Sequence, residues 1–98
     1  MTVNSTESGN VVTLHVKGRF DFAIHQDFIR AYKAYPRGEK KFEVDLSAAE
    51  YMDSSAMGML LQLREHAERG GSIVLRNGSE GIKEILRIAN FDKLFQLT

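Results

Sequence analysis

The chain has 98 residues, and its 13 Lys and Arg residues balance 13 Asp and Glu residues, so it carries no formal net charge. This balance argues against nucleic acid or an anionic membrane as a partner, and the absence of cysteine excludes disulfides and thiolate metal sites. The N-terminus lacks a basic segment followed by an apolar one, and no apolar run is long enough to span a membrane, so we expect a cytoplasmic protein that folds as one domain over residues 1–98.

The N-terminal third of the sequence predicts a β-hairpin followed by a helix. Residues 2–8 are β-branched at alternating positions, residues 11–18 alternate apolar and polar side chains, and a Gly-Asn turn joins them. Aromatic and aliphatic residues then recur at steps of four, which predicts an amphipathic helix beginning near Phe22 or Ala23. Asp21 is placed to cap this helix, and the only proline of the chain interrupts the pattern after it.

The remainder of the sequence alternates between strand and helix patterns. The longest helical segment begins with small polar residues and ends with charged ones, as the helix macrodipole favours. The predicted elements are a central strand at 41–46, a helix at 53–69 ended by Gly70-Gly71, a strand at 72–77, a helix at about 79–89 and a short apolar tail at 91–97 that could add a last strand. Together they predict an α/β fold with a mixed β-sheet of four to five strands and helices packed on it.

The segment Glu50–Met59 crosses from the carboxyl end of a strand into the first turn of a helix. Such junctions are where α/β sheets bind ligands and expose reactive groups. The first backbone N–H groups of the helix can be bonded by Asp53 or Ser54 side chains, or by phosphate oxygens. A phosphate on Ser54 would lie in a favourable helix dipole but beside the negative charge of Asp53. The tripeptide Asp53-Ser54-Ser55 also fits a helix N-cap with no further role.

Other chemistry is only weakly signalled. His15, His25 and His66 could in principle form a hydrolytic triad with Ser54, which would make the chain a small hydrolase with Ser54 as nucleophile. No Gly-x-Ser-x-Gly motif supports this alternative. The aspartates lack the spacing of metal ligands, and the glycines form no nucleotide-binding loop, so we expect neither a metal nor a cofactor.

Four features, in order along the chain, carry a family resemblance. They are Gly18-Arg19-Phe20-Asp21 after the hairpin, the apolar strand Phe42–Ser47, the segment Tyr51–Gly58, and the pair Gly70-Gly71 followed later by Asn90-Phe91. The third of them is similar to an Asp-Ser-Ser/Thr-Gly-Leu-Gly signature. In this combination the sequence resembles a STAS domain, specifically a bacterial anti-sigma factor antagonist.

The resemblance implies a STAS-like fold and a non-enzymatic role in partner switching. In that family the serine directly after the signature aspartate is phosphorylated; it corresponds to Ser54, and Ser55 is the less favoured neighbour. The unphosphorylated protein would bind an anti-sigma factor or a serine kinase, phosphorylation would release it, and a PP2C-type phosphatase, in some members fused to a response-regulator domain, would restore binding. Contacts with the partner would involve Asp21, Asp53, Ser55, Ala56, Met57 and Gly58.

The sequence departs from the family pattern at two places. Ala56 replaces the first glycine of the signature, which predicts a more ordered first helical turn. The sequence ends at Thr98, where many members continue into another helix, so we expect part of the sheet to be less covered. Met57 and Met59 diverge around the helix, so we expect Met57 to face outward; the alternative is that both belong to the core. A phosphorylation-independent STAS module that senses a ligand or serves as a scaffold is the third interpretation.

Overall fold

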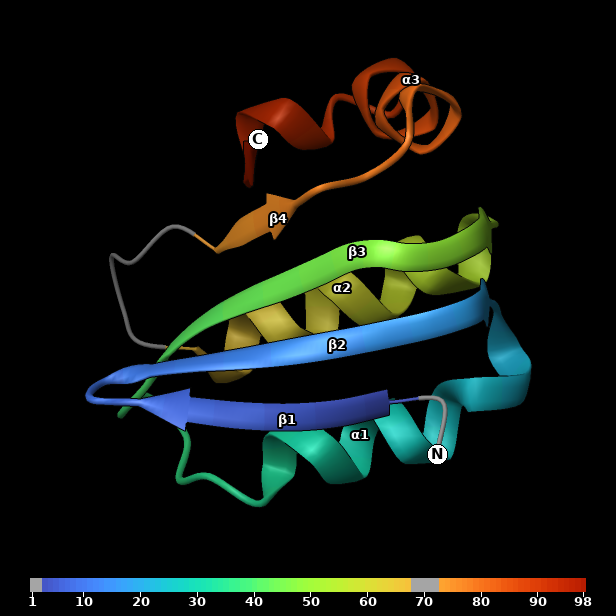
Figure 1. Cartoon of the computed structure of the whole chain (residues 1–98). Helices are drawn as coiled ribbons and strands as arrows, with labels where there is room; N and C mark the ends of the chain where they lie inside the picture. Colours follow the sequence, from blue (N-terminus) through green and yellow to red (C-terminus); the bar gives the residue numbers. More distant parts are fainter. Residues whose placement is uncertain (1–2, 68–72) are drawn as a thin grey trace.

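The computed structural model describes residues 3–67 and 73–98, which form one five-stranded sheet with helices packed on it (Figure 1). The strands are β1 (Val3–Ser8), β2 (Val11–Phe20), β3 (Lys41–Met52), β4 (Val74–Arg76) and β5 (Gln96–Leu97), in that order across the sheet. β1 runs antiparallel to β2, whereas the other neighbouring pairs are parallel. The predicted mixed sheet with an N-terminal hairpin is therefore confirmed.

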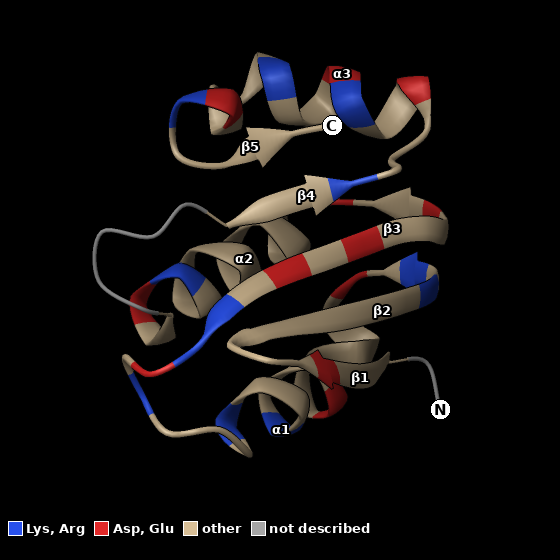
Figure 2. Cartoon of the chain, turned by 60° about the vertical axis from the view of Figure 1, so that its left-hand side comes forward, with Lys and Arg blue, Asp and Glu red and all other residues tan. Residues whose placement is uncertain are grey.

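Helical segments connect the parallel strands. They are η1 (Phe22–Ile24), α1 (His25–Lys33), α2 (Ser54–His66), α3 (Glu80–Ile88) and η2 (Phe91–Lys93). α1 and α2 lie side by side on one face of the sheet, behind β1 to β3, and α3 lies towards the β4 end (Figure 1). α1 and α3 carry charged side chains of both signs, whereas the charged residues of α2 are confined to Arg64 and Glu65 near its C-terminal end (Figure 2). No helix in the described ranges combines the length and apolarity needed to cross a membrane.

β3 is longer than the sequence pattern predicts, because it continues past residue 46 to Met52. Residues 47–52 lack regular apolar alternation, so their strand conformation depends on pairing with the second half of β2. The ladder there contains register shifts, and Gly18, at one of them, has a φ of 80° that suits glycine. α2 ends at His66, earlier than the predicted end at residue 69, because Ala67 already has an extended backbone; the pair Gly70-Gly71 lies outside the described residues. The predicted last strand is present as β5.

Side-chain alternation divides the sheet into a buried face and an open face. The side chains on the buried face include Val12, Leu14 and Val16 of β2 and Phe42, Val44 and Leu46 of β3. They form one cluster with Phe28 and Tyr32 of α1 and with Leu60 and Leu63 of α2. The intervening residues of β2 and β3 point the other way, and most of them are polar and half-buried. The two helices thus cover one face, and polar side chains cover much of the other.

A chain of hydrogen bonds crosses the open face from β1 to β3. His15 lies opposite Asp45 in the ladder, and its Nδ1 donates to Asp45 Oδ2 at 2.9 Å. The other ring nitrogen of His15 lies 3.0 Å from the Thr6 hydroxyl. Burial alone would raise the pKa of Asp45, but hydrogen bonds from the Ser47 backbone N–H and from His15 outweigh it and lower the pKa to about 2. Asp45 therefore stays ionised and keeps a proton on Nδ1 of His15.

This network predicts a specific loss of stability in acid. The pKa of Asp45 lies below the ordinary value of 3.8, so its ionised form stabilises the fold above that pH, and the stabilisation is lost as the pH falls towards about 2. We expect Asp45→Asn to cost about 1–2 kcal/mol at neutral pH and to flatten the fall of unfolding free energy in this acid range. Urea unfolding at several pH values measures both effects. Asp92→Asn, at an exposed position, should keep the wild-type slope, and an equally steep slope in Asp45→Asn would contradict the assignment.

Candidate functional site

The ends of two neighbouring parallel strands create the site. Phe20 is the last residue of β2 and is paired with Met52, the last residue of β3. The residue that follows each of these strands is an aspartate: Asp21 caps η1 and Asp53 caps α2. Both helical segments therefore begin at the same edge of the sheet, where the carboxyl ends of parallel strands commonly present functional groups.

Asp53 holds the first turn of α2 in place. Its Oδ1 atom accepts hydrogen bonds from the backbone N–H groups of Ser55 at 3.0 Å and Ala56 at 3.2 Å, and from the Ser55 hydroxyl at 2.6 Å. The hydrogen bond from the Ser55 hydroxyl is the main reason that the pKa of Asp53 lies below its ordinary value. The carboxylate is thus ionised at neutral pH and is committed to capping the helix.

The two serines after Asp53 have different environments. Ser54 is the first residue of α2, is exposed, and its hydroxyl has no hydrogen bond to any described residue. Ser55 is half-buried and its hydroxyl is held by Asp53. Of the two hydroxyl groups, only that of Ser54 is accessible without breaking the helix cap.

Arg19 and Tyr51 form a contact beside the two capping aspartates. The sequence pattern did not predict this contact. The two residues are directly opposite in the β2–β3 ladder, and the Arg19 guanidinium lies 4.0 Å from the centre of the Tyr51 ring. Arg19 Nε also donates to Asp21 Oδ2 at 3.2 Å. The pKa of Asp53 is lowered mainly by the hydrogen bond from the Ser55 hydroxyl and further by those from the Ala56 and Ser55 backbone N–H groups, and the charge of Arg19 adds a smaller effect in the same direction. Arg19 therefore interacts with both capping carboxylates: it is hydrogen-bonded to Asp21, and its charge favours the ionised form of Asp53.

Phe22 is an exposed aromatic residue next to Asp21. Its side chain is 68% exposed and its ring stacks on His25 at 4.8 Å between centroids. The sequence does contain a signal for this, because Phe22 falls between the residues that recur at steps of four and so cannot share their buried face. A large exposed aromatic beside two charged caps is the composition expected of a contact surface.

The expected partner-contact residues on α2 do not all reach the surface. Ala56 is completely buried, so its side chain belongs to the core and cannot touch a partner, because the inner face of the first helical turn packs on the sheet. Met59 is buried, Met57 is half-buried against the core, and Gly58 is exposed. The exposed part of this turn thus consists of Ser54, Gly58 and parts of Ser55 and Met57.

The structure does not assemble a hydrolytic triad around Ser54. His15 bonds to Asp45 on the open face of the sheet, and His66 Nε2 donates to the Tyr35 carbonyl oxygen at 2.7 Å. His25 stacks on Phe22 and, like the other two, has no hydrogen bond to Ser54 in the described part of the chain. Over the same ranges, no three His, Asp or Glu side chains are arranged to hold a metal ion.

These features define the class of protein. A mixed sheet in which β3 is followed by a capping aspartate and then by a serine at the start of α2 is the arrangement that the STAS resemblance implies. Residues 3–97 match the family described as "Mlab, STAS domain". The chain belongs to this STAS-domain family. It is 42% identical over 99 residues to a STAS-domain containing protein of Pseudomonas aeruginosa (strain UCBPP-PA14), which it matches over 100% of its own length and 98% of the relative's.

Solved structures share the fold. A putative anti-sigma factor antagonist from Thermotoga maritima superposes with a TM-score of 0.83 at 19% identity, covering 97% of this chain and 84% of that one. The anti-sigma factor antagonist SpoIIAA in its unphosphorylated form gives a TM-score of 0.63 at 19% identity, covering 88% of this chain and 82% of that one. At such low identity the likeness is one of fold.

Proposed function

We propose that this chain is a non-enzymatic anti-sigma factor antagonist that works as a phosphorylation-controlled partner switch. The unphosphorylated form binds an anti-sigma factor or a serine kinase, phosphorylation of Ser54 releases the partner, and a PP2C-type phosphatase restores binding. The family membership and the names of proteins with the same fold support the general role. The observation that carries the proposal is the exposed hydroxyl of Ser54, which makes no hydrogen bond to the described residues and lies beside the ionised cap of α2.

The charge balance around Ser54 explains how a phosphate could be tolerated by the fold and still act as a signal. A phosphoserine adds a charge of about −1.5 to −2 at the positive end of the α2 dipole, which is favourable. The same charge lies next to ionised Asp53, so the local negative potential rises sharply. Because no hydrogen bond within the described residues must break, the fold is retained while the surface changes its charge.

The contact surface of the unphosphorylated form would surround this serine. Phe22 and Tyr51 provide exposed aromatic area, and Asp21 and Arg19 provide opposite charges. Aromatic residues and arginine are the residue types that carry most binding energy in protein interfaces. A phosphate placed among them would have to be desolvated when the partner docks, which opposes binding.

Mass spectrometry of the protein isolated from its own cells tests the proposal directly. We expect a phosphorylated fraction whose modified residue is Ser54, absent in Ser54→Ala and retained in Ser55→Ala. Ser55→Ala is the matched control because it removes the neighbouring hydroxyl and one cap hydrogen bond but leaves Ser54 unchanged. A chain that is never modified at Ser54 under any growth condition would instead favour the phosphorylation-independent scaffold.

A further inference from the structure

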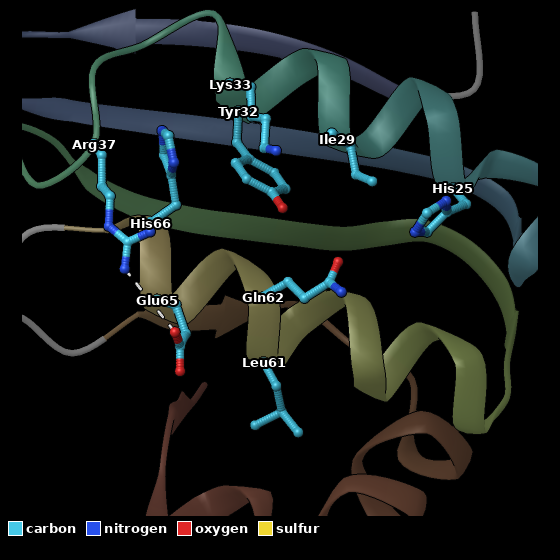
Figure 3. A pocket seen from close by; sticks show the side chains of 9 residues that line it. All are labelled: His25, Ile29, Tyr32, Lys33, Arg37, Leu61, Gln62, Glu65 and His66. Atoms are coloured by element: carbon cyan, nitrogen blue, oxygen red, sulfur yellow. Dashed lines mark ion pairs between the residues drawn. The ribbon is translucent and has the colours of Figure 1, made fainter.

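A groove between α1 and α2 has no role in the proposed switch. It encloses about 450 Å³, within the range of small-molecule sites. Its lining comes from α1 and the loop after it on one side and from the C-terminal half of α2 on the other: His25, Ile29, Tyr32, Lys33, Arg37, Leu61, Gln62, Glu65 and His66 (Figure 3). Ser54 lies at the opposite end of α2 and does not line it.

Tyr32 places its hydroxyl group in this groove. The residue is only 3% exposed, and its ring packs in the core against Phe28 and Phe42. The hydroxyl nevertheless points towards α2 across the groove, and it makes no hydrogen bond to any described residue (Figure 3). Burial raises the pKa of Tyr32, so the hydroxyl keeps its proton at neutral pH. No buried side-chain oxygen of the described residues lacks a hydrogen-bond partner, so the Tyr32 hydroxyl reaches solvent at the groove and is available to donate to a bound group.

The charged side chains of the groove favour an anion. Lys33 forms no ion pair with any described residue, and Arg37 approaches Glu65 only at 4.0 Å, with both side chains largely exposed. Glu65 is the one carboxylate among the lining residues. His66 donates from Nε2 to the Tyr35 carbonyl oxygen, so its Nδ1 is left for another contact. Cations therefore exceed carboxylates around the opening.

The groove also has apolar walls. Ile29 is packed against the core cluster, and Leu61 is 40% exposed at the rim. We propose that this groove binds a small organic anion with a carboxylate or phosphate monoester group beside Lys33 and Arg37, a hydrogen bond from the Tyr32 hydroxyl, and an apolar or aromatic body over Ile29 and Leu61. The inference stands independently of the Ser54 switch, because the two sites share no residue.

Titration of the ¹⁵N-labelled full chain tests this proposal, with phenyl phosphate and phenylacetate as probes. We expect saturable shifts of the backbone amides near residues 29–37 and 61–66. Tyr32→Phe, which removes only the hydroxyl, should weaken binding about fivefold. Lys33→Gln should weaken it about threefold at low salt, with a smaller effect as salt is added. Lys93→Gln, a lysine outside the groove, should bind as the wild type does.

Inorganic phosphate and benzyl alcohol separate the two halves of the proposed ligand. Each should bind more weakly than phenyl phosphate, because each lacks one of the two groups that the groove would recognise. If inorganic phosphate binds as tightly as phenyl phosphate, the groove is a simple anion site. If benzyl alcohol binds as tightly as phenyl phosphate, the groove is a simple apolar site. Either result overturns the proposal. It also fails if neither anionic probe gives saturable shifts, or if Tyr32→Phe and Lys33→Gln both bind as the wild type does.

Discussion

Ser54→Asp is expected to weaken the complex with the partner of the unphosphorylated form by about 100- to 1,000-fold. The new carboxylate would lie at the first residue of α2, beside ionised Asp53, on a surface that must lose its water when the partner docks. The fold should remain intact, because the Ser54 side chain has no hydrogen bond within the described residues to lose. Isothermal titration calorimetry with the purified partner measures the change.

Two control variants show whether the expected loss of affinity depends on the position of the new charge or on the added charge alone. Ser54→Ala should bind about as tightly as the wild type, since it adds no charge. Ser8→Asp introduces the same charge at the exposed end of β1, which meets the N-terminal end of β2 and so lies at the other edge of the sheet. It should also leave affinity nearly unchanged. A Ser54→Asp variant that binds as tightly as the wild type would refute the switch at this site.

Phe20→Ala is expected to destabilise the fold by about 3–5 kcal/mol, a range typical of large-to-small changes in a core. Phe20 is completely buried at the end of β2, and its ring lies 5.2 Å from that of Phe28 between centroids. Truncation leaves a cavity directly beneath the turn that carries Asp21, so the contact surface should loosen together with the core. Urea unfolding followed by circular dichroism gives the loss of free energy.

Phe22→Ala provides the matched control, because it removes the same side chain two residues later. Phe22 is 68% exposed, so we expect a change in stability within about 0.5 kcal/mol. If Phe22 contributes to the partner surface as we propose, the same variant should lose affinity without losing stability. Similar losses of stability in Phe20→Ala and Phe22→Ala would contradict this expectation, because the exposed Phe22 ring would then stabilise the fold as much as the buried Phe20 ring does.

The local pattern of the sequence was sufficient for most of the fold. Strict alternation in β2 and helical spacing in α1 and α3 predicted these elements, since each pattern reports which side of an element is apolar. The caps at Asp21 and Asp53 followed from side-chain chemistry that acts within three residues. The position of Ser54 at the start of a helix was likewise predictable, because it depends on neighbours in the chain.

Contacts between distant segments were decided only by the tertiary structure. Arg19 meets Tyr51, and His15 meets Asp45, because the register of β2 on β3 brings them opposite each other. The burial of Ala56 and the groove beside Tyr32 depend on how closely the helices pack on the sheet and on each other. The physical reason is that periodicity records the apolar side of each element, whereas register and packing distance depend on two elements at once.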